Sequence, residues 1–457
     1  MSARLENNLR LYPLHQMFAG ALFWMPTIVL FLVEELGFAR ALSVQAVYYI
    51  AVVVLELPTG WLSDRLGRVL ALRLVTGTWI ASHLTFVFAP NVAGLLAAQV
   101  LLAAGYAFLS GTDVTFHFDT LEALGRSDEF VEREARSRQR LLLVTAGSAL
   151  LGGAVGLIDL RVPFALSALA ACAQGIVASR LVEPAVPGEP ADDTALSGSP
   201  SETAESGRFG IARGLRHPAL LWVAVYLVFQ VVVIHLVADL SGPYLAESIG
   251  ASSLRDAALI TGVSAAAAAL MGAFIVSRVP AMADRFGSVT TLVVAAVVPV
   301  AVLVVMALTI SPWILALLPL RVLPRASASV IAPAIVGRHI DRQARASFLS
   351  LASLGGRLAF GAVMIGIGLA DLALGPTLTL GAIVGAVLWT LVMLFQRLAI
   401  DATDIDRERV AHQHSHLHVH WGSHGHVHAE HRIPLRVHRH GHEHGHEHGH
   451  RHEPSPG

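Results

Sequence analysis

The sequence has no lysine, a single cysteine and few charged residues. All 32 of its Lys and Arg positions are arginine, which we attribute to genomic base composition and which carries no functional information. Only 14% of the residues are charged, against about 25% in soluble proteins, and this excludes an ordinary soluble protein. Cys172 alone cannot build a disulfide framework or a cysteine-based metal site within one chain.

Motifs typical of enzymes are also missing. The sequence contains no nucleophile elbow, phosphate-binding loop or dinucleotide fingerprint. We therefore expect a protein that is not an enzyme, requires no cofactor and does not bind nucleic acid. We also expect a monomer. The formal net charge of -1 indicates little about partners.

The sequence instead contains many long apolar runs. Hydrophobic residues make up 54% of the chain, and the mean hydropathy is +0.61. A helix of roughly 20 apolar residues crosses about 30 Å of hydrocarbon, and barrel strands would alternate polar and apolar residues, which these runs do not. We therefore predict an all-α membrane protein with twelve transmembrane helices. The predicted spans lie roughly at 14–33, 43–62, 70–89, 93–118, 141–159, 162–182, 218–244, 256–277, 289–310, 313–337, 346–369 and 372–396.

Arginine is concentrated in every second connection between these runs, as in the stretches 65–73 and 126–140. Because cytoplasmic loops are rich in arginine and lysine, we expect these connections and both termini in the cytoplasm of a bacterium, with the chain in the inner membrane. The first run follows Arg4 and Arg10 and precedes no small-residue cleavage site. We therefore expect a retained helix and not a signal peptide.

A change of composition divides the chain. Residues 183–217 are rich in Pro, Ser, Thr, Asp and Glu, which is typical of a flexible linker. We predict an N-terminal six-helix bundle at 1–182, a cytoplasmic linker at 183–217 and a C-terminal six-helix bundle at 218–398. A disordered cytoplasmic tail rich in histidine is predicted at 399–457.

One short charged stretch separates the second apolar run from the third, and it reads Gly60-Trp61-Leu62-Ser63-Asp64-Arg65-Leu66-Gly67-Arg68. It fills every fixed position of the pattern Gly-x-Leu-x-Asp-Arg-x-Gly-Arg. In this it resembles the signature loop between the second and third helices of the major facilitator superfamily. The resemblance implies two pseudo-symmetric six-helix bundles that carry solutes across a bilayer by alternating access.

A second, degraded copy of the stretch begins 220 residues later, at Pro280. In the superfamily this loop is a conformational latch, and we expect Gly60 and Gly67 to permit a tight turn there. The alternative is an ordinary solvated turn. The residues to which the resemblance gives the latch role are Gly60, Asp64, Arg65, Gly67, Arg68, Asp284 and Arg285.

Ionisable side chains within the apolar runs are candidate site residues, because a charge in hydrocarbon costs several kcal/mol unless it is paired or hydrated. Three pairs are spaced by four residues, which places both members on one helix face. These pairs are Asp113 with His117, His235 with Asp239, and Arg321 with Arg325, and Asp119 lies near the cytoplasmic end of the fourth run. In the superfamily the fourth, seventh and tenth helices line the central cavity, so the resemblance implies that these residues face it.

Two interpretations of these charges remain open. Protonation of a cavity carboxylate or histidine could compete with substrate binding, which is the minimal requirement for proton-coupled antiport. Alternatively, Asp113, Asp239, Arg321 and Arg325 form structural ion pairs between the halves. The two arginines favour an anionic or carboxylate-bearing solute.

Two further features of the runs predict packing. Gly147, Gly152, Gly153 and Gly156 give the fifth run small faces for close helix contact. Glu56, near the end of the second run, is expected to pack beside the latch, with a direct contact to substrate as the alternative.

The tail is unusual because 17 of the 23 histidines follow residue 411. Imidazole binds zinc, nickel, cobalt and copper, and alternating histidines let a flexible chain surround one ion with several ligands. The predicted metal ligands are His412, His414, His416, His418, His420, His424, His426, His428, His438, His440, His442, His444, His446, His448, His450 and His452.

The leading functional hypothesis is a secondary transporter, most simply a proton-coupled exporter of a small solute. The alternative within this class is a divalent transition-metal exporter, in which Asp113, His117, His235 and Asp239 hold the ion and the tail collects it. A third hypothesis is a metal sensor that no longer transports. The partners are thus the lipid bilayer, protons, and a small molecule or metal ion.

Overall fold

The computed structural model describes residues 2–89, 91–184, 217–340, 342–410, 416–421 and 435–440. The chain divides into two compact units, Met1–Gln396 and Arg397–Gly457. The α-helices are α1 (Ser2–Ala19), α2 (Ile28–Leu36), α3 (Phe38–Leu66), α4 (Arg68–Phe88), α5 (Val92–Leu109), α6 (Thr112–Ala123), α7 (Phe130–Gly156), α8 (Val162–Ser179), α10 (Pro218–Ser248), α11 (Ala258–Phe286), α12 (Ser288–Leu308), α13 (Leu323–His339), α14 (Arg342–Leu369) and α15 (Leu374–Val410). Short 3-10 helices are η1 (Ser127–Glu129), η3 (Leu254–Ala257), η4 (Pro312–Ala316) and η5 (Leu318–Val322).

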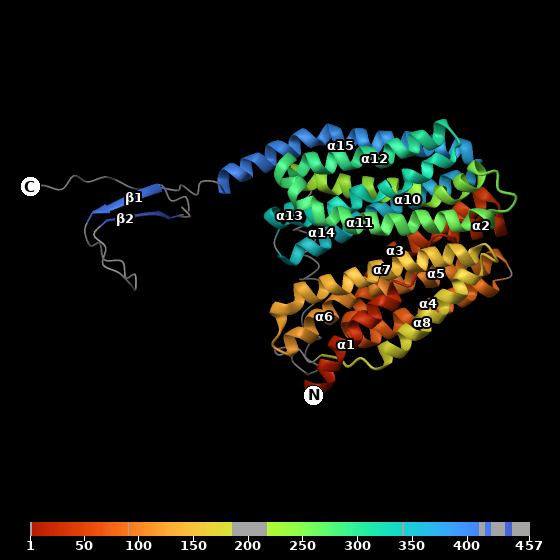
Figure 1. The fold of residues 1–457 in the computed structure, drawn as a ribbon, viewed down its shortest axis with the longest axis horizontal. Coiled ribbons are helices and arrows are strands. Elements are labelled where there is room, and N and C mark those ends of the chain that lie inside the picture. Colours follow the sequence, from red (N-terminus) through yellow and green to blue (C-terminus); the bar gives the residue numbers. More distant parts are fainter. Residues whose placement is uncertain are drawn as a thin grey trace, which may run out of the picture. The chain divides into compact units, whose positions relative to one another are not determined.

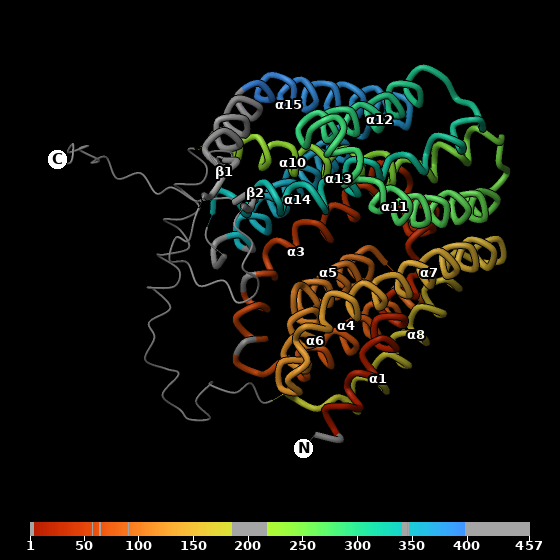
Figure 2. Tube along the Cα trace, turned by 60° about the vertical axis from the view of Figure 1, so that its left-hand side comes forward, coloured from red at the N-terminus to blue at the C-terminus, as the bar shows by residue number. Residues whose placement is uncertain are grey.

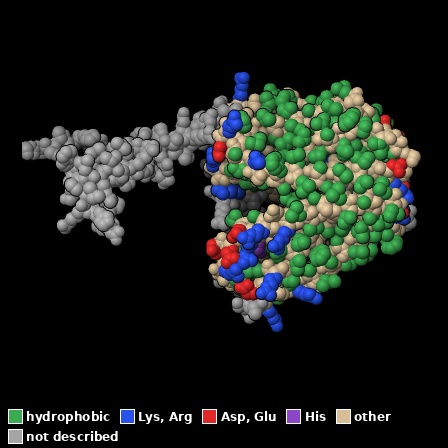
Figure 3. Space-filling view, in the orientation of Figure 1, with side chains coloured by type: hydrophobic (Ala, Val, Ile, Leu, Met, Phe, Trp, Pro, Cys, Tyr) green, Lys and Arg blue, Asp and Glu red, His purple; other side chains and the backbone are tan. Residues whose placement is uncertain are grey.

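Eleven helical segments among the described residues are long and apolar enough to cross a membrane. The prediction of an all-α membrane fold is therefore confirmed, although the count of twelve continuous spans is not reached. The helices of the first half and those of the second half gather in two lobes (Figures 1 and 2). Hydrophobic side chains cover the visible face between the ends, and charged side chains gather at both ends (Figure 3).

The first predicted span, 14–33, is wrong as a continuous helix, because the chain leaves helical geometry at 20–27. Pro26 lacks a backbone N–H and so cannot continue a helix from the preceding turn. The hydroxyls of Thr145, Ser148 and Ser167 hydrogen-bond backbone groups of this segment at 2.9, 3.1 and 3.3 Å. Side chains of α7 and α8 thus satisfy peptide groups that lipid could not.

The fourth predicted span, 93–118, is also interrupted. α5 ends at Leu109 and α6 begins at Thr112, and Gly111 between them has φ 77°, a left-handed conformation that favours glycine. The tenth predicted span begins in 3-10 turns at η5 before it continues as α13. Three of the predicted spans are therefore discontinuous.

The internal repeat is reproduced in the helix limits. α11 begins and ends 220 residues after α3, and α12 begins and ends 220 residues after α4. Between each pair stands a single glycine with positive φ, Gly67 at 87° and Gly287 at 84°. The same helix–glycine–helix corner is thus built once in each half. The boundaries at 183 and 218 remain predictions, since most residues between them lie outside the described part of the chain.

α7 and α11 join the two halves at the end of the molecule opposite Gly67. A methyl group added at Gly153 would lie 2.6 Å from the carbonyl oxygen of Ala258, and one at Gly262 would lie 2.9 Å from the Cα of Gly153. The prediction of close packing is confirmed for Gly153, whereas Gly147 has nothing within 4 Å of an added methyl group. Backbones approach this closely only where side chains are absent.

The second unit begins within α15, which continues to Val410. Two strands, β1 (His416–Trp421) and β2 (Leu435–His440), pair antiparallel with His418 opposite His438. The alternation of histidine with apolar residues in 416–421 has the two-residue period of a strand. The predicted limits of the tail and its disorder stay predictions.

Replacing Gly153 with valine should push α7 away from α11. Overpacking at such a contact costs about 1–3 kcal/mol, so we expect the thermal unfolding midpoint of the purified protein to fall. Gly147→Val, at the exposed glycine of the same helix, is the matched control and should change the midpoint little. Equal midpoints for the two variants would show that this contact does not hold the halves together.

Candidate functional site

A cavity of about 450 Å³ lies between the two halves. Its wall is formed by the break at 20–27, α2, α3 and α5 from the first half, and by α10, α11, η5, α13 and α14 from the second. Met25 and Pro26 of the break face into it. A ligand bound here would contact both halves of the protein.

Three arginines, one aspartate and one histidine line the cavity, and all belong to the second half. They are His235 and Asp239 of α10, Arg321 of η5, Arg325 of α13 and Arg357 of α14. Asp239 is 8% exposed and Arg321 9%, whereas Arg325 is exposed. With three guanidinium groups against one carboxylate, the wall carries a net positive charge.

The arginines are held by groups other than carboxylates. Arg321 donates to the carbonyl oxygen of Leu318 at 2.9 Å and approaches the Ser264 hydroxyl at 3.5 Å. Arg357 interacts with the hydroxyl of Tyr48, and Arg325 has no hydrogen-bond or ion-pair partner among the described residues. Their guanidinium groups therefore remain available to a ligand.

Aromatic and amide side chains form the facing part of the wall. Tyr49 of α3 donates to Asp239 across the halves at 3.4 Å. Its ring lies edge-on to Phe360 and His235, with ring centroids 4.6 and 5.1 Å apart. The cavity therefore offers apolar ring faces beside its charged groups.

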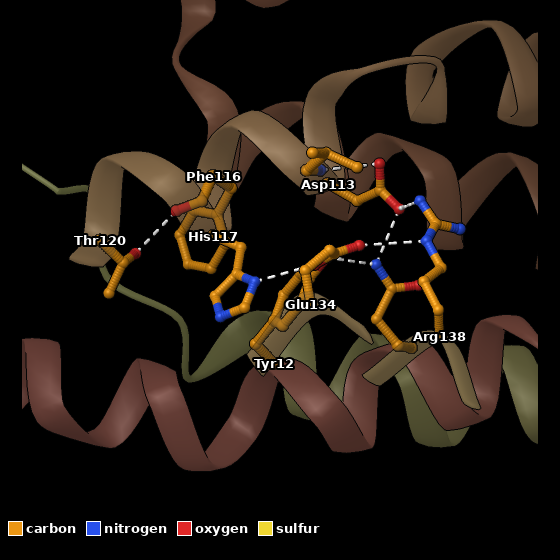
Figure 4. Close-up of polar contacts among 9 residues, drawn as sticks. Tyr12, Asp113, Phe116, His117, Thr120, Glu134 and Arg138 are labelled. Carbon is orange, nitrogen blue, oxygen red and sulfur yellow. Dashed lines mark hydrogen bonds and ion pairs between the residues drawn. The ribbon is translucent and has the colours of Figure 1, made fainter. Parts of the chain in front are cut away.

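Asp113, His117 and Asp119 do not line this cavity, contrary to our expectation. They lie on α6, beyond the break at Gly111, and α6 packs against α1 and α7 (Figure 4). Asp113 is 4% exposed and accepts hydrogen bonds from Gln16 at 2.7 Å and Arg138 at 3.4 Å. Asp113 and His117 are both buried on α6, as their four-residue spacing predicts, but the interruption before α6 separates them from His235 and Asp239.

Glu134 of α7 is the centre of this second cluster (Figure 4). Its carboxylate accepts from the Tyr12 hydroxyl at 2.9 Å and the Arg138 Nε at 3.0 Å, and contacts the His117 Nδ1 at 2.8 Å. The cluster thereby connects α1, α6 and the first turns of α7. It forms a polar core within the first half.

The signature corner is built around Gly67. The backbone N–H groups of Arg68 and Val69 donate to the two oxygens of Glu183 at 2.7 and 2.8 Å. A carboxylate at the N-terminus of α4 satisfies free amides and interacts favourably with the helix dipole. The Arg68 side chain lies 3.8 Å from Asp119, so this predicted cavity residue belongs to the corner.

The prediction that Gly60 permits a turn is wrong. α3 continues through Leu66, so Gly60 is helical and only Gly67 has a positive φ. The side chain of Asp64 lies outside the described residues. The latch roles of both residues stay predictions.

Two of the remaining latch residues, Arg65 and Arg285, lie against aromatic rings. The guanidinium of Arg65 lies 4.0 Å from the Trp61 ring centroid, and that of Arg285 lies 5.2 Å from the Phe286 ring centroid. Asp284 is exposed near the end of α11. Each half thus places the arginine of its signature stretch near an aromatic ring, in agreement with the repeat.

The end of the cavity opposite Gly67 is closed by contacts between the halves. Arg255 of η3 donates to Glu34 at 2.9 Å and to the carbonyl oxygen of Ile158 at 3.2 Å. Arg161 donates to Glu35 at 2.7 Å, and this hydrogen bond raises the pKa of Arg161. One arginine of the second half is thus tied to two elements of the first. At the other end the molecule is hollowed between its lobes (Figure 3).

Glu56 links the halves by a third contact. Its carboxylate accepts from the Ser350 hydroxyl of α14 at 2.8 Å and from Ser110 at 3.4 Å. It does not line the cavity between the halves. This arrangement favours packing over a direct contact with substrate.

Metal ligands are not clustered in the described part of the protein, where no group of three or more His, Cys, Asp or Glu side chains could hold an ion. His235 and Asp239 are the only such residues among those that line the cavity. The histidine side chains of the tail lie outside the described residues, so metal binding there stays a prediction.

Several site residues were not identified from the sequence. Arg357, Gln45 and Gln99 of the cavity are polar residues inside apolar runs, and that signal could have found them. Glu183 lies at the start of the predicted linker. Its position directly after an apolar run was the one sequence signal that it could cap a helix. Glu134 lies before the predicted fifth span and gave no signal.

No protein-family model and no curated protein matches this chain. Solved structures do match. A nucleoside transporter, NupG, is 14% identical with a TM-score of 0.68, covering 86% of this chain and 99% of that one. A D-xylose–proton symporter is 14% identical with a TM-score of 0.62, covering 85% and 97%. A bacterial homolog of the human lysosomal transporter Spinster is 14% identical with a TM-score of 0.62, covering 87% and 97%.

These likenesses establish the fold. The chain has the fold of major facilitator superfamily transporters, as its signature stretch indicated, and it is a multi-pass membrane protein. Their substrates belong to those proteins, since identities this low carry no ligand across.

Replacing Glu134 with alanine should loosen the cluster of Figure 4. The Tyr12, His117 and Arg138 groups would lose their shared acceptor, which we expect to cost about 3 kcal/mol of unfolding free energy. Glu132→Ala removes a 68% exposed carboxylate that pairs with Arg136 on the same helix, and it should change stability by less than about 0.5 kcal/mol. Denaturation of both purified variants checks this. A Glu134→Ala protein as stable as Glu132→Ala contradicts the assignment.

Proposed function

We propose that the protein is a secondary active transporter that carries a small organic anion together with protons by alternating access. The observation that carries the proposal is the cavity wall, in which Arg321, Arg325 and Arg357 face a single carboxylate. Burying cations is unfavourable unless they are paired. An anionic solute supplies the missing pairing.

The size and composition of the cavity support a solute with an apolar portion. Guanidinium groups bind carboxylates or phosphates through two parallel hydrogen bonds. Tyr48, Tyr49 and Tyr106 present ring surfaces in the same space of about 450 Å³. A carboxylate on a compact, partly apolar skeleton fits this combination.

Asp239 is our candidate for the coupling proton. It is nearly buried, shares the cavity with the arginines and accepts from Tyr49 of the other half. When ionised it competes with an anionic solute for the same positive wall, and when protonated it does not. Proton binding therefore favours solute binding on whichever side the cavity is open.

The contacts between the halves support alternating access. Arg255 with Glu34, and Gly153 with Ala258, close one end of the cavity. Opening that end requires these contacts to separate while the Gly67 end closes. We place the Gly67 end and both termini in the cytoplasm of a bacterial inner membrane, because the arginine-rich connections lie there.

Divalent metal export is less well supported than anion transport. The four ligands that we expected to share a cavity site are divided between two clusters, and three arginines repel a bare cation. Metal binding by the tail remains a proposal from its composition. Such binding is compatible with a role in regulation and with transport of a metal chelate.

Replacing Arg325 with glutamine tests the anionic cavity. We expect benzoate and malate, but not the uncharged xylose and uridine, to raise the thermal unfolding midpoint of the wild-type protein. Loss of one charge-assisted hydrogen bond should weaken that binding by about tenfold or more.

Arg338→Gln, at the exposed arginine near the end of the same helix, is the matched control and should bind the carboxylates like the wild type. Stabilisation by xylose or uridine with no effect of the carboxylates would contradict the proposal. A chain truncated after residue 400 that still transports carboxylates would show that the tail is not needed.

Replacing Asp239 with asparagine should uncouple transport from protons. In proteoliposomes, a pH gradient should drive carboxylate movement by the wild type and by Glu247→Gln, an exposed carboxylate of the same helix. Asp239→Asn should retain exchange of carboxylates across the bilayer but lose the acceleration by the gradient. An unchanged response to the gradient would leave Asp239 with only a structural role.

A further inference from the structure

We propose that the first half also binds the phosphate group of an anionic phospholipid, at a basic cavity separate from the one between the halves. This cavity has a volume of about 120 Å³. It lies among α1, α6 and α7, and its wall contains no carboxylate. Its lining residues are Leu9, Pro13, His117, Arg133, Arg136, Ser137 and Arg140.

The wall is rich in hydrogen-bond donors. Arg133 is held from its other side by Glu129 at 2.7 Å, and Arg136 by Glu132. By contrast, Arg140 has no hydrogen-bond or ion-pair partner among the described residues, and neither does the hydroxyl of Ser137. Ser137 is 2% exposed and lines the cavity beside these arginines.

His117 adds a further polar edge to the wall. Its Nδ1 contacts Glu134 at 2.8 Å, which fixes the ring, while the same ring lines the cavity. Glu134 and Asp113, the carboxylates around His117, are engaged by Arg138. The carboxylates that pair with Arg133 and Arg136 do not line the cavity, so its wall carries three guanidinium groups and no carboxylate.

The position of the cavity favours a lipid over a free anion. Its arginines occupy the start of α7, and the helix becomes apolar directly after Arg140. Leu143 of α7 and Leu14 of α1 are 57% and 43% exposed. A basic pocket next to an exposed apolar surface at one end of a transmembrane helix suits a phosphate head group with its acyl chains alongside. Arginine side chains gather with acidic ones at this end of the lobe (Figure 3).

A bound phosphate would join His117 of α6 to the arginines of α7 from outside, as Glu134 joins α6 to α7 from within. The site thus connects the surrounding lipid to the polar core of the first half. This link does not depend on which solute the central cavity carries. An experiment that contradicts the lipid site would therefore leave the proposal of an anionic solute untouched, and the reverse also holds.

The test is lipid binding to the purified full-length protein, measured by native mass spectrometry. Palmitoyl-oleoyl phosphatidylglycerol should bind the wild type, and palmitoyl-oleoyl phosphatidylcholine should bind much more weakly. Arg140→Gln should weaken phosphatidylglycerol binding by about tenfold, and Ser137→Ala should weaken it severalfold. Both substitutions remove donors without removing a carboxylate partner, so both proteins should fold.

Arg278→Gln is the matched control, because it removes an exposed arginine from the corresponding end of α11, and it should bind phosphatidylglycerol within twofold of the wild type. Equal binding by all four proteins overturns the proposal, as does an equal loss in the control, which would indicate only general attraction to the membrane surface. Binding of inorganic phosphate without binding of phosphatidylglycerol would also overturn the assignment to lipid.

Discussion

The structure depends on one constraint: in hydrocarbon, no peptide group or charge is stable without a partner. A helix satisfies its own backbone, so most of the chain is helical. Where the first span unwinds at 20–27, the hydroxyls of Thr145, Ser148 and Ser167 supply the partners that the helix no longer does. The same constraint places the guanidinium groups of Arg321, Arg325 and Arg357 in the cavity between the halves, and it holds Asp113 and Glu134 in a closed network. Interruptions of regular structure are tolerated only where polar side chains are already present.

Much of the fold could be predicted from the sequence, because its signals are local. Apolar run length located the spans, and the repeat of Asp-Arg-x-Gly from Asp64 to Asp284 gave the two halves, with an offset that the helix limits reproduce to the residue. The breaks were harder to predict. Leu-Phe-Trp-Met at 22–25 is apolar enough to be a span, and its loss of helical geometry depends on hydroxyls that lie more than a hundred residues away.

The candidate site was predicted in part. The breaks in the helices explain which of the predicted residues line the cavity and which do not. His235 and Asp239 lie on the uninterrupted α10, so their four-residue spacing placed both in the cavity. Asp113 and His117 have that spacing too, but Gly111 turns α6 away from the line of α5. Glu183 and Glu134 act through partners distant in sequence, and no spacing rule could have paired them with Val69 or Tyr12.

The two signature corners have the same backbone but different chemistry. At Gly67 the carboxylate of Glu183 receives two amides of α4. At Gly287, no described side chain accepts from the corresponding amides of α12, and the nearest group to an added methyl is Thr290, 4.0 Å away. The carboxylate that caps α4 belongs to the segment that directly follows α8, so the first corner is fixed to the end of the first half. The repeat has therefore kept the path of the backbone in both halves, while only the first half adds a side chain that restrains the corner.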